Sequence, residues 1–143
     1  MHRPRPGTTA GPSGGWVDLP VLVVEDDDEL RSLLELQLEE AGVETQGAPN
    51  GAVALEVLAK QPFALVLLDV HMPVLDGHAT LRILRRDNRY AHLPVVALTG
   101  RVGPKERDEL MRLGADECLA KPIATEELHR VLRRHGVLSA GAL

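Results

Sequence analysis

Residues 64–77, ALVLLDVHMPVLDG, decide the fold of this chain. The apolar run of residues 64–68 leads directly into a carboxylate, Asp69. An uninterrupted apolar run of strand length predicts a strand that is buried on both faces of a parallel sheet. Pro73, which cannot donate to a sheet, and the turn dipeptide Asp76-Gly77 predict a loop after this strand. Such a strand presents Asp69 at its carboxyl end, where open α/β sheets place their ligand sites.

The composition limits the classes of protein to consider. The chain has 143 residues and a formal net charge of −5, which fits one domain and shows no basic patch for nucleic acid. The single cysteine, Cys118, excludes an internal disulfide and fits a reducing compartment. No apolar run approaches the length of a membrane span, and no secretory signal is visible. We therefore expect a cytoplasmic protein that binds neither a membrane nor nucleic acid directly.

Strands and helices alternate along the chain. Besides the run before Asp69, apolar runs predict buried strands at residues 21–24 and 94–98, and short strands are expected at residues 43–47, nearer an edge, and 117–120. A helix is expected after each of these strands. The first helix has apolar residues at helical spacing: Leu30, Leu33, Leu34, Leu38 and Ala41. The others are expected at residues 52–60, 78–86, 104–113 and 125–134. The alternation predicts an α/β fold: a doubly wound, five-stranded parallel sheet, covered on both faces and joined by right-handed crossovers.

Both ends of the chain are expected to lie outside this domain. Residues 1–18 begin with a stretch rich in Gly, Pro, Ser and Thr and are expected to form a disordered tail or linker. The domain is expected to span residues 19–135, followed by a frayed tail at residues 136–143. No DNA-binding unit is expected after the last helix, because the remaining residues are too few for one.

Polar side chains follow four of the predicted strands. In chain order they are Glu25 with Asp26, then Asp69, Thr99 and Lys121. In a flavodoxin-like strand order of 2-1-3-4-5 these strand ends share one edge of the sheet, and strands one and three are neighbours. Crowded carboxylates repel each other unless a cation lies among them, and hard oxygen ligands suit Mg²⁺. A hydroxyl and an ammonium are groups that hold phosphoryl oxygens.

Four motifs resemble those of response-regulator receiver domains of two-component signalling. They are VVEDD at 23–27, LLDVHMPVLDG at 67–77, ALTG at 97–100 and LAKPI at 119–123. The resemblance covers residues 19–134, nearly everything except the two tails. It implies that Asp69 accepts a phosphoryl group from a histidine kinase or a histidine phosphotransfer protein. Aspartyl phosphate is an established type of covalent intermediate, and a carboxylate needs no base to form it.

The resemblance also implies a magnesium site. Asp26, Asp69 and the backbone carbonyl of His71 are expected to bind Mg²⁺. Glu25, which stands where the family more often has Asp, is expected to assist through a water molecule. Water in the same site is expected to hydrolyse the acyl phosphate. We therefore expect a phosphoacceptor with weak intrinsic phosphotransfer and autodephosphorylation rather than an enzyme.

A switch is implied at the other strand ends. Thr99 is expected to move toward the phosphoryl group and Lys121 to pair with it, and the bond before Pro122 is a candidate cis peptide. Cys118 stands where receivers usually carry an aromatic ring that swings inward with the threonine, so this chain lacks that part of the switch. A downstream protein is expected on the face of residues 104–113, 117–120 and 125–134. The two helices of that face are also a candidate surface for weak self-association.

Two other functions fit parts of the pattern. A haloacid-dehalogenase-type phosphatase also uses an aspartyl nucleophile, but it requires a second acid where this chain has His71. A receiver-shaped interaction module that is not phosphorylated would keep the same fold. The intact acids, threonine and lysine argue against it, whereas Cys118 keeps it open. A receiver could stand alone or belong to a larger hybrid kinase.

Overall fold

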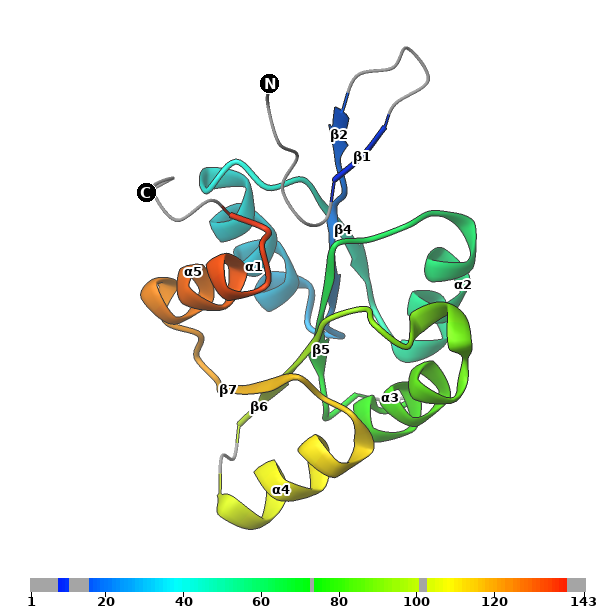
Figure 1. The fold of residues 1–143 in the computed structure, drawn as a ribbon. Helices are drawn as coiled ribbons and strands as arrows, with labels where there is room; N and C mark the ends of the chain where they lie inside the picture. Colours follow the sequence, from blue (N-terminus) through cyan, green and yellow to red (C-terminus); the bar gives the residue numbers. More distant parts are fainter. Residues whose placement is uncertain (1–7, 11–15, 73, 101–102, 139–143) are drawn as a thin grey trace.

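The structure is a computed structural model that describes residues 8–10, 16–72, 74–100 and 103–138 (Figure 1). Five strands form a parallel sheet in the order β4-β3-β5-β6-β7. Their bounds are β3 Val21–Val24, β4 Thr45–Ala48, β5 Leu65–Asp69, β6 Val95–Thr99 and β7 Glu117–Ala120. Numbered along the chain, this is the 2-1-3-4-5 order, so the predicted fold class is confirmed.

Helices cover both faces of the sheet (Figure 1). Their bounds are α1 Asp28–Glu40, α2 Gly51–Lys60, α3 Gly77–Arg86, α4 Pro104–Leu113 and α5 Thr125–Arg134, with a 3₁₀ turn, η1, at Asn88–Tyr90. Helices α1 and α5 lie on one face, and α2, α3 and α4 lie on the other. This two-sided cover explains why the inner strands β3, β5 and β6 are continuously apolar up to their last residues rather than alternating, whereas the edge strand β4 is more polar and only partly buried.

Local chemistry sets where the helices begin and end. The side chains of Asp27, Asn50 and Asp76 accept hydrogen bonds from N–H groups in the first turns of α1, α2 and α3. Pro104 occupies the first turn of α4, where the missing N–H is tolerated. Gly114 ends α4 in the left-handed conformation, with φ of 113°.

The core is divided into two layers by the sheet. Because successive strand residues point to opposite faces, one layer packs against α1 and α5 and includes Val21, Val23, Leu65, Leu67, Leu98 and Leu119. The other packs against α2, α3 and α4 and includes Leu22, Val24, Val66, Leu68, Ala97 and Cys118. By the same alternation, the strand-end residue Asp69 belongs to the face of α1 and α5, whereas Thr99 belongs to the face of α4.

The leucines that stand at helical spacing in α1 are not equally buried. Leu34 and Leu38 are buried, but Leu30 and Leu33 are 39% and 53% exposed. The first turns of α1 lie beside the strand ends, where Leu30 and Leu33 line a groove with Ile123. The start of α1 therefore presents an apolar surface next to the acidic strand ends.

Part of the expected N-terminal tail is described as a strand pair. Among residues 1–18, Thr8–Ala10 (β1) pairs with Trp16–Asp18 (β2) as an antiparallel ladder. Residues 1–7 and 11–15 lie outside the described residues, so the expectation of a disordered tail or linker stays a prediction.

The expected C-terminal tail is corrected in part. Val137 and Leu138 are only 5% and 4% exposed, in the layer that packs against α1 and α5. Their N–H groups donate to the carbonyl oxygen of Leu132 at 2.8 and 3.2 Å. Gly136, with φ of 74°, permits the turn that folds them back. The gain from burying two apolar side chains explains why Val137 and Leu138 pack on the domain. Residues 139–143 lie outside the described residues.

Candidate functional site

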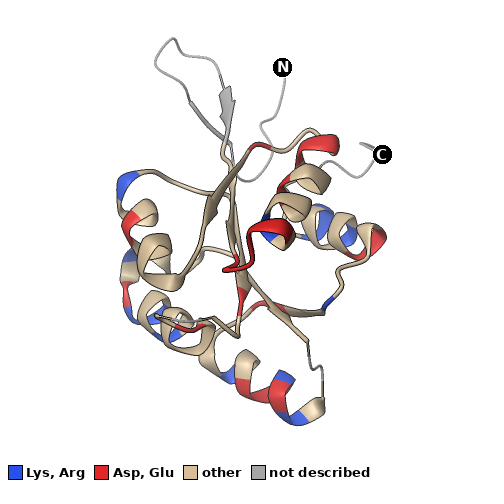
Figure 2. Cartoon of the chain, turned by 180° about the vertical axis from the view of Figure 1, so that it is seen from behind, with Lys and Arg blue, Asp and Glu red and all other residues tan. Residues whose placement is uncertain are grey.

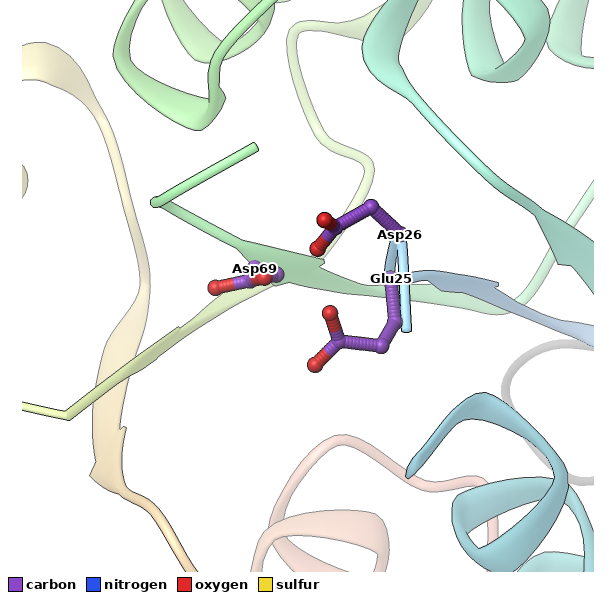
Figure 3. A group of neighbouring side chains, drawn as sticks. All are labelled: Glu25, Asp26 and Asp69. Atoms are coloured by element: carbon purple, nitrogen blue, oxygen red, sulfur yellow. The ribbon is translucent and has the colours of Figure 1, made fainter. Parts of the chain in front are cut away.

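Three carboxylates meet at the carboxyl ends of β3 and β5 (Figure 3). Glu25 and Asp26 directly follow β3, and Asp69 is the last residue of β5. The two strands are neighbours, with Val24 opposite Leu68, so their ends lie side by side. One carboxylate oxygen from each acid lies within 4.8 Å of the others. The structure thus brings together the acids that the strand order predicted to be adjacent.

Burial makes this concentration of charge costly. Glu25 and Asp69 are each only 1% exposed, whereas Asp26 faces solvent. Desolvation and the neighbouring Glu25 carboxylate raise the pKa of Asp26. The same charge concentration is visible as the acidic segment that joins β3 to α1 near the middle of the molecule (Figure 2). These acids therefore favour a positive partner.

Lys121, directly after β7, supplies one positive partner. Its Nζ atom lies 2.7 Å from Glu25 Oε1 and 3.0 Å from Asp69 Oδ1. Burial acts against the ammonium charge, but the hydrogen bonds to Glu25 and Asp69 outweigh it and raise the pKa of Lys121. The lysine is therefore held in its charged form between two buried carboxylates.

Further hydrogen bonds orient the acids. Glu25 Oε2 accepts from the N–H of Asp27 at 3.3 Å, and the carbonyl oxygen of Glu25 accepts from Arg31 Nη1 at 2.7 Å. The N–H of His71 donates to Asp69 Oδ1 at 3.2 Å. Both buried carboxylates are thus anchored by the backbone that follows their own strands, which keeps them pre-organised for a ligand.

Thr99 contacts α4. It is 1% exposed at the end of β6, and its hydroxyl donates to Glu106 Oε1 at 3.2 Å. His71 Nε2 lies 3.3 Å from the same oxygen, and the His71 side chain is 60% exposed. Nothing in the sequence singled out Glu106, because an acid in the first turn of a helix is already explained by the helix dipole.

The two remaining predicted positions lie on or just after β7. Cys118 is 8% exposed and lies opposite Ala97 in the layer that faces α2, α3 and α4. Burial raises the pKa of its thiol, with Arg107 acting in the opposite direction. Cys118 therefore packs as a small apolar residue. The peptide bond between Lys121 and Pro122 is cis.

The donor set fits a hard divalent cation. Mg²⁺ binds through one or two carboxylates and keeps several waters, and here carboxylates of different exposure are grouped around one point. In the part of the chain that the structure describes, Glu25, Asp26 and Asp69 are the one such group of acids, histidines or cysteines. Among the described helices, none has the length and apolar character needed to cross a membrane.

A doubly wound sheet that carries two acids, a third acid, a threonine and a lysine at its strand ends defines the class of receiver-type signalling domains. Residues 21–133 match the response regulator receiver domain family, and the chain belongs to this family. It is thus a receiver domain of two-component signalling. Receiver domains are signalling modules that interact with histidine kinases and downstream targets.

Relatives occur both in response regulators and in sensor kinases. The chain is 40% identical over 117 residues to the response regulator protein FleR of Pseudomonas aeruginosa, covering 82% of this chain and 24% of FleR. It is 35% identical over 115 residues to the sensor histidine kinase GacS of Pseudomonas protegens, covering 78% of this chain and 12% of GacS. It therefore spans less than a third of either curated relative.

A solved relative holds a metal ion. The receiver domain of the sensor histidine kinase PA1611 from Pseudomonas aeruginosa was crystallised with a magnesium ion coordinated in its active-site cleft. It is 29% identical to this chain, with a TM-score of 0.76, and the match covers 82% of this chain and 97% of that one.

Proposed function

We propose that this chain is the phosphoacceptor of a two-component phosphorelay, phosphorylated on Asp69 by a histidine kinase or a histidine phosphotransfer protein. The observation that carries the proposal is the convergence of three carboxylates and the Lys121 ammonium at one edge of the sheet. An Asp69 carboxylate oxygen attacks the phosphorus, and the P–N bond to the donor imidazole breaks as the P–O bond forms. The electron pair of the broken bond returns to the imidazole nitrogen.

Mg²⁺ belongs to this proposal. Asp26, Asp69 and the backbone carbonyl of His71 would hold the ion directly, and Glu25, already bonded to Lys121, would act through a water molecule. When bound, the ion neutralises charge on the phosphoryl oxygens. The solved receiver that contains magnesium supports this assignment by similarity.

The remaining side chains position the transferring group. In the unmodified protein the Lys121 ammonium is shared between Glu25 and Asp69, within reach of a phosphoryl oxygen on Asp69. The Thr99 hydroxyl is the second donor, after it turns toward the site. Catalysis then consists of orientation and charge stabilisation, as is general in phosphoryl transfer. Water that enters the same site hydrolyses the acyl phosphate, so the signal is self-limiting.

Protein contacts complete the proposal. The donor must reach Asp69 across the surface around the strand ends, and the exposed Leu30 and Leu33 make part of that surface apolar. We assign this part of α1 to the phosphodonor. The face of α4, β7 and α5 is assigned to the downstream target, and its two helices to weak self-association.

Intact-mass spectrometry after incubation with acetyl phosphate, with and without Mg²⁺, tests the phosphorylation. We expect a single added phosphoryl group that depends on Mg²⁺ and is lost in Asp69→Asn, with circular dichroism unchanged. Asp108→Asn, which changes an exposed acid of α4, is the matched control and should label like wild type. Undiminished labelling of Asp69→Asn would show that the nucleophile is another residue. A folded, Mg²⁺-binding chain that never labels would instead support the interaction module.

A further inference from the structure

The carboxylate of Glu106 joins two segments that border the phosphorylation site. Its Oε1 atom accepts the hydroxyl hydrogen bond of Thr99 at 3.2 Å and lies 3.3 Å from His71 Nε2. Thr99 is the last residue of β6, and His71 follows the acceptor strand β5 by two positions. Glu106 itself lies in the first turn of α4. One oxygen atom therefore connects α4 to both strand ends.

This contact competes with the phosphoryl group. A threonine hydroxyl has one hydrogen to donate, and an ionised carboxylate can only accept. While Thr99 donates to Glu106, the same hydrogen is not available to a phosphoryl oxygen on Asp69. The strand alternation also places Thr99 on the α4 face and Asp69 on the opposite face, so the hydroxyl must turn between two acceptors.

Among the described residues, the N-terminal turn of α4 has few other attachments, so loss of the hydrogen bond between Thr99 and Glu106 would affect it. The N-cap residue Gly103 makes no side-chain hydrogen bond to the first turn, and Leu110 is the residue that α4 buries. Glu106 is thus a polar tie between the N-terminal turn of α4 and the sheet. Cys118 is too small to carry motion from Thr99 across this layer as an aromatic ring could.

We propose that Glu106 is a positioning residue of the switch: it holds Thr99 away from Asp69 in the unmodified protein, and phosphorylation takes Thr99 from it and releases the first turn of α4. The proposal rests on the proposed function of Asp69. It adds a residue and a direction of coupling that replace the missing aromatic ring at Cys118.

Hydrogen exchange measured by mass spectrometry at residues 105–110 tests the tie, before and after phosphorylation with acetyl phosphate and Mg²⁺. In unmodified Glu106→Ala we expect exchange about fivefold faster than in wild type, the scale of one lost hydrogen bond, and close to that of the phosphorylated wild type. Phosphorylation should then add little further change. Glu109→Ala, which removes an exposed acid from the same helix, should behave as wild type.

A second comparison separates the tie from the helix dipole. Removing Glu106 also removes a favourable first-turn charge, which alone could fray α4. In a Thr99→Val background the hydrogen bond between Thr99 and Glu106 is absent while the contact with His71 remains, so Glu106→Ala should have a clearly smaller effect there than in wild type. In a Thr99→Ser background, which keeps a hydroxyl, Glu106→Ala should have its full effect. Glu106→Gln keeps an acceptor and should lie between wild type and Glu106→Ala.

The outcomes divide clearly. An effect of Glu106→Ala that is as large in Thr99→Val as in wild type, or a Glu106→Gln variant equal to Glu106→Ala, would show that the hydrogen bond to Thr99 does not hold α4 and would overturn the proposal. The proposal would also be overturned if phosphorylation changed hydrogen exchange in α4 by the same amount in Glu106→Ala as in wild type. A wild-type chain that never labels would refute the proposed function, whereas the comparison of unmodified variants still decides whether Glu106 holds Thr99.

Discussion

Asp26 shows how the site is poised for a cation at the scale of single residues. Lys121 contacts Glu25 and Asp69, and both of these carboxylates are buried. Asp26 is the third acid of the group, and desolvation and Glu25 raise its pKa. The raised pKa means that the folded protein resists the ionised form of Asp26. The carboxylate that we propose as a metal ligand is in this way kept at some expense to the stability of the metal-free protein.

Asp26→Asn should therefore change metal binding and stability in opposite directions. We expect the free energy of unfolding without metal to rise by about 0.5–1 kcal/mol, because a repelled and exposed charge is removed. Mg²⁺ binding, measured by calorimetric titration, should weaken at least tenfold through loss of a carboxylate ligand.

Glu29→Gln is the matched control for this variant. It removes another exposed acid from the same run, but one that favours the start of α1. It should lower stability slightly and leave Mg²⁺ binding unchanged. A stabilised Glu29→Gln would show that general charge reduction, rather than crowding at Asp26, explains the result.

Single residues differ in how far the sequence predicts them. Asp69 could be found because it directly follows an apolar strand, so its position in the fold follows from its position in the chain. The pairing of Lys121 with Glu25 joins residues 96 positions apart and depends on side-chain geometry within the predicted edge. Glu106 could not be found, because its place in a first turn has an ordinary explanation and its contact depends on how the preceding residues fold.

At the scale of elements, the junction of β5 and α3 holds Asp69 in place. Gly77, the first residue of α3, donates its N–H to the carbonyl of Val70 at 3.2 Å. A Cβ atom at this glycine would meet the backbone of Asp69 and Val70 directly. Glycine at this position thus allows a helix to begin in direct contact with the end of β5.

Gly77→Ala should damage both the fold and the site. We expect a loss of about 2–3 kcal/mol in the free energy of unfolding, because the contacting atoms are backbone and cannot turn away. Labelling by acetyl phosphate should slow under conditions in which the variant remains folded. Gly103→Ala, where a Cβ meets nothing within 4 Å, should stay within about 0.5 kcal/mol of wild type in the same urea titration.

The exposed start of α1 leads to a prediction about partners. Leu33→Glu should slow phosphoryl transfer from a phosphorylated histidine phosphotransfer domain that labels the wild type by about tenfold, the scale of a lost interface anchor. Labelling by acetyl phosphate, which needs no docking surface, should be unchanged. Ile83→Glu, at a 44% exposed position of α3, is the matched control. Equal transfer rates in both variants would place the donor elsewhere.

Elements also differ in how far the sequence predicts them. Caps, breakers and apolar runs are local, and they predicted the strands of the sheet and its helices to within a few residues. Whether Leu33 or Val137 is buried depends on which other element lies opposite. The sequence predicted fraying for Val137, which is buried, and the helical spacing of Leu33 did not show that its side chain is exposed. In both cases a neighbouring element, not the local pattern, decides the burial.

At the scale of the whole molecule, the ion pairs of the site also link separate strands of the sheet. Lys121 follows β7, an edge strand, and its ammonium reaches the ends of β3 and β5 in the centre of the sheet. The contact therefore closes the strand-end edge across β6. Binding events at this edge can accordingly alter the stability of the entire domain.

Lys121→Ala should show how much this link between the strands stabilises the domain. Without metal we expect a loss of about 2 kcal/mol in the free energy of unfolding, because a buried Glu25 loses its partner while the 24% exposed lysine site still admits solvent. Saturating Mg²⁺ should recover a larger share of stability in Lys121→Ala than it adds to wild type, because the ion then replaces the positive charge that Lys121 placed beside Glu25 and Asp69. Urea titrations with and without Mg²⁺ measure both quantities. Equal increments from Mg²⁺ in the two proteins would show that lysine and metal do not share the same carboxylates, and that Lys121 stabilises the sheet independently of the phosphorylation site.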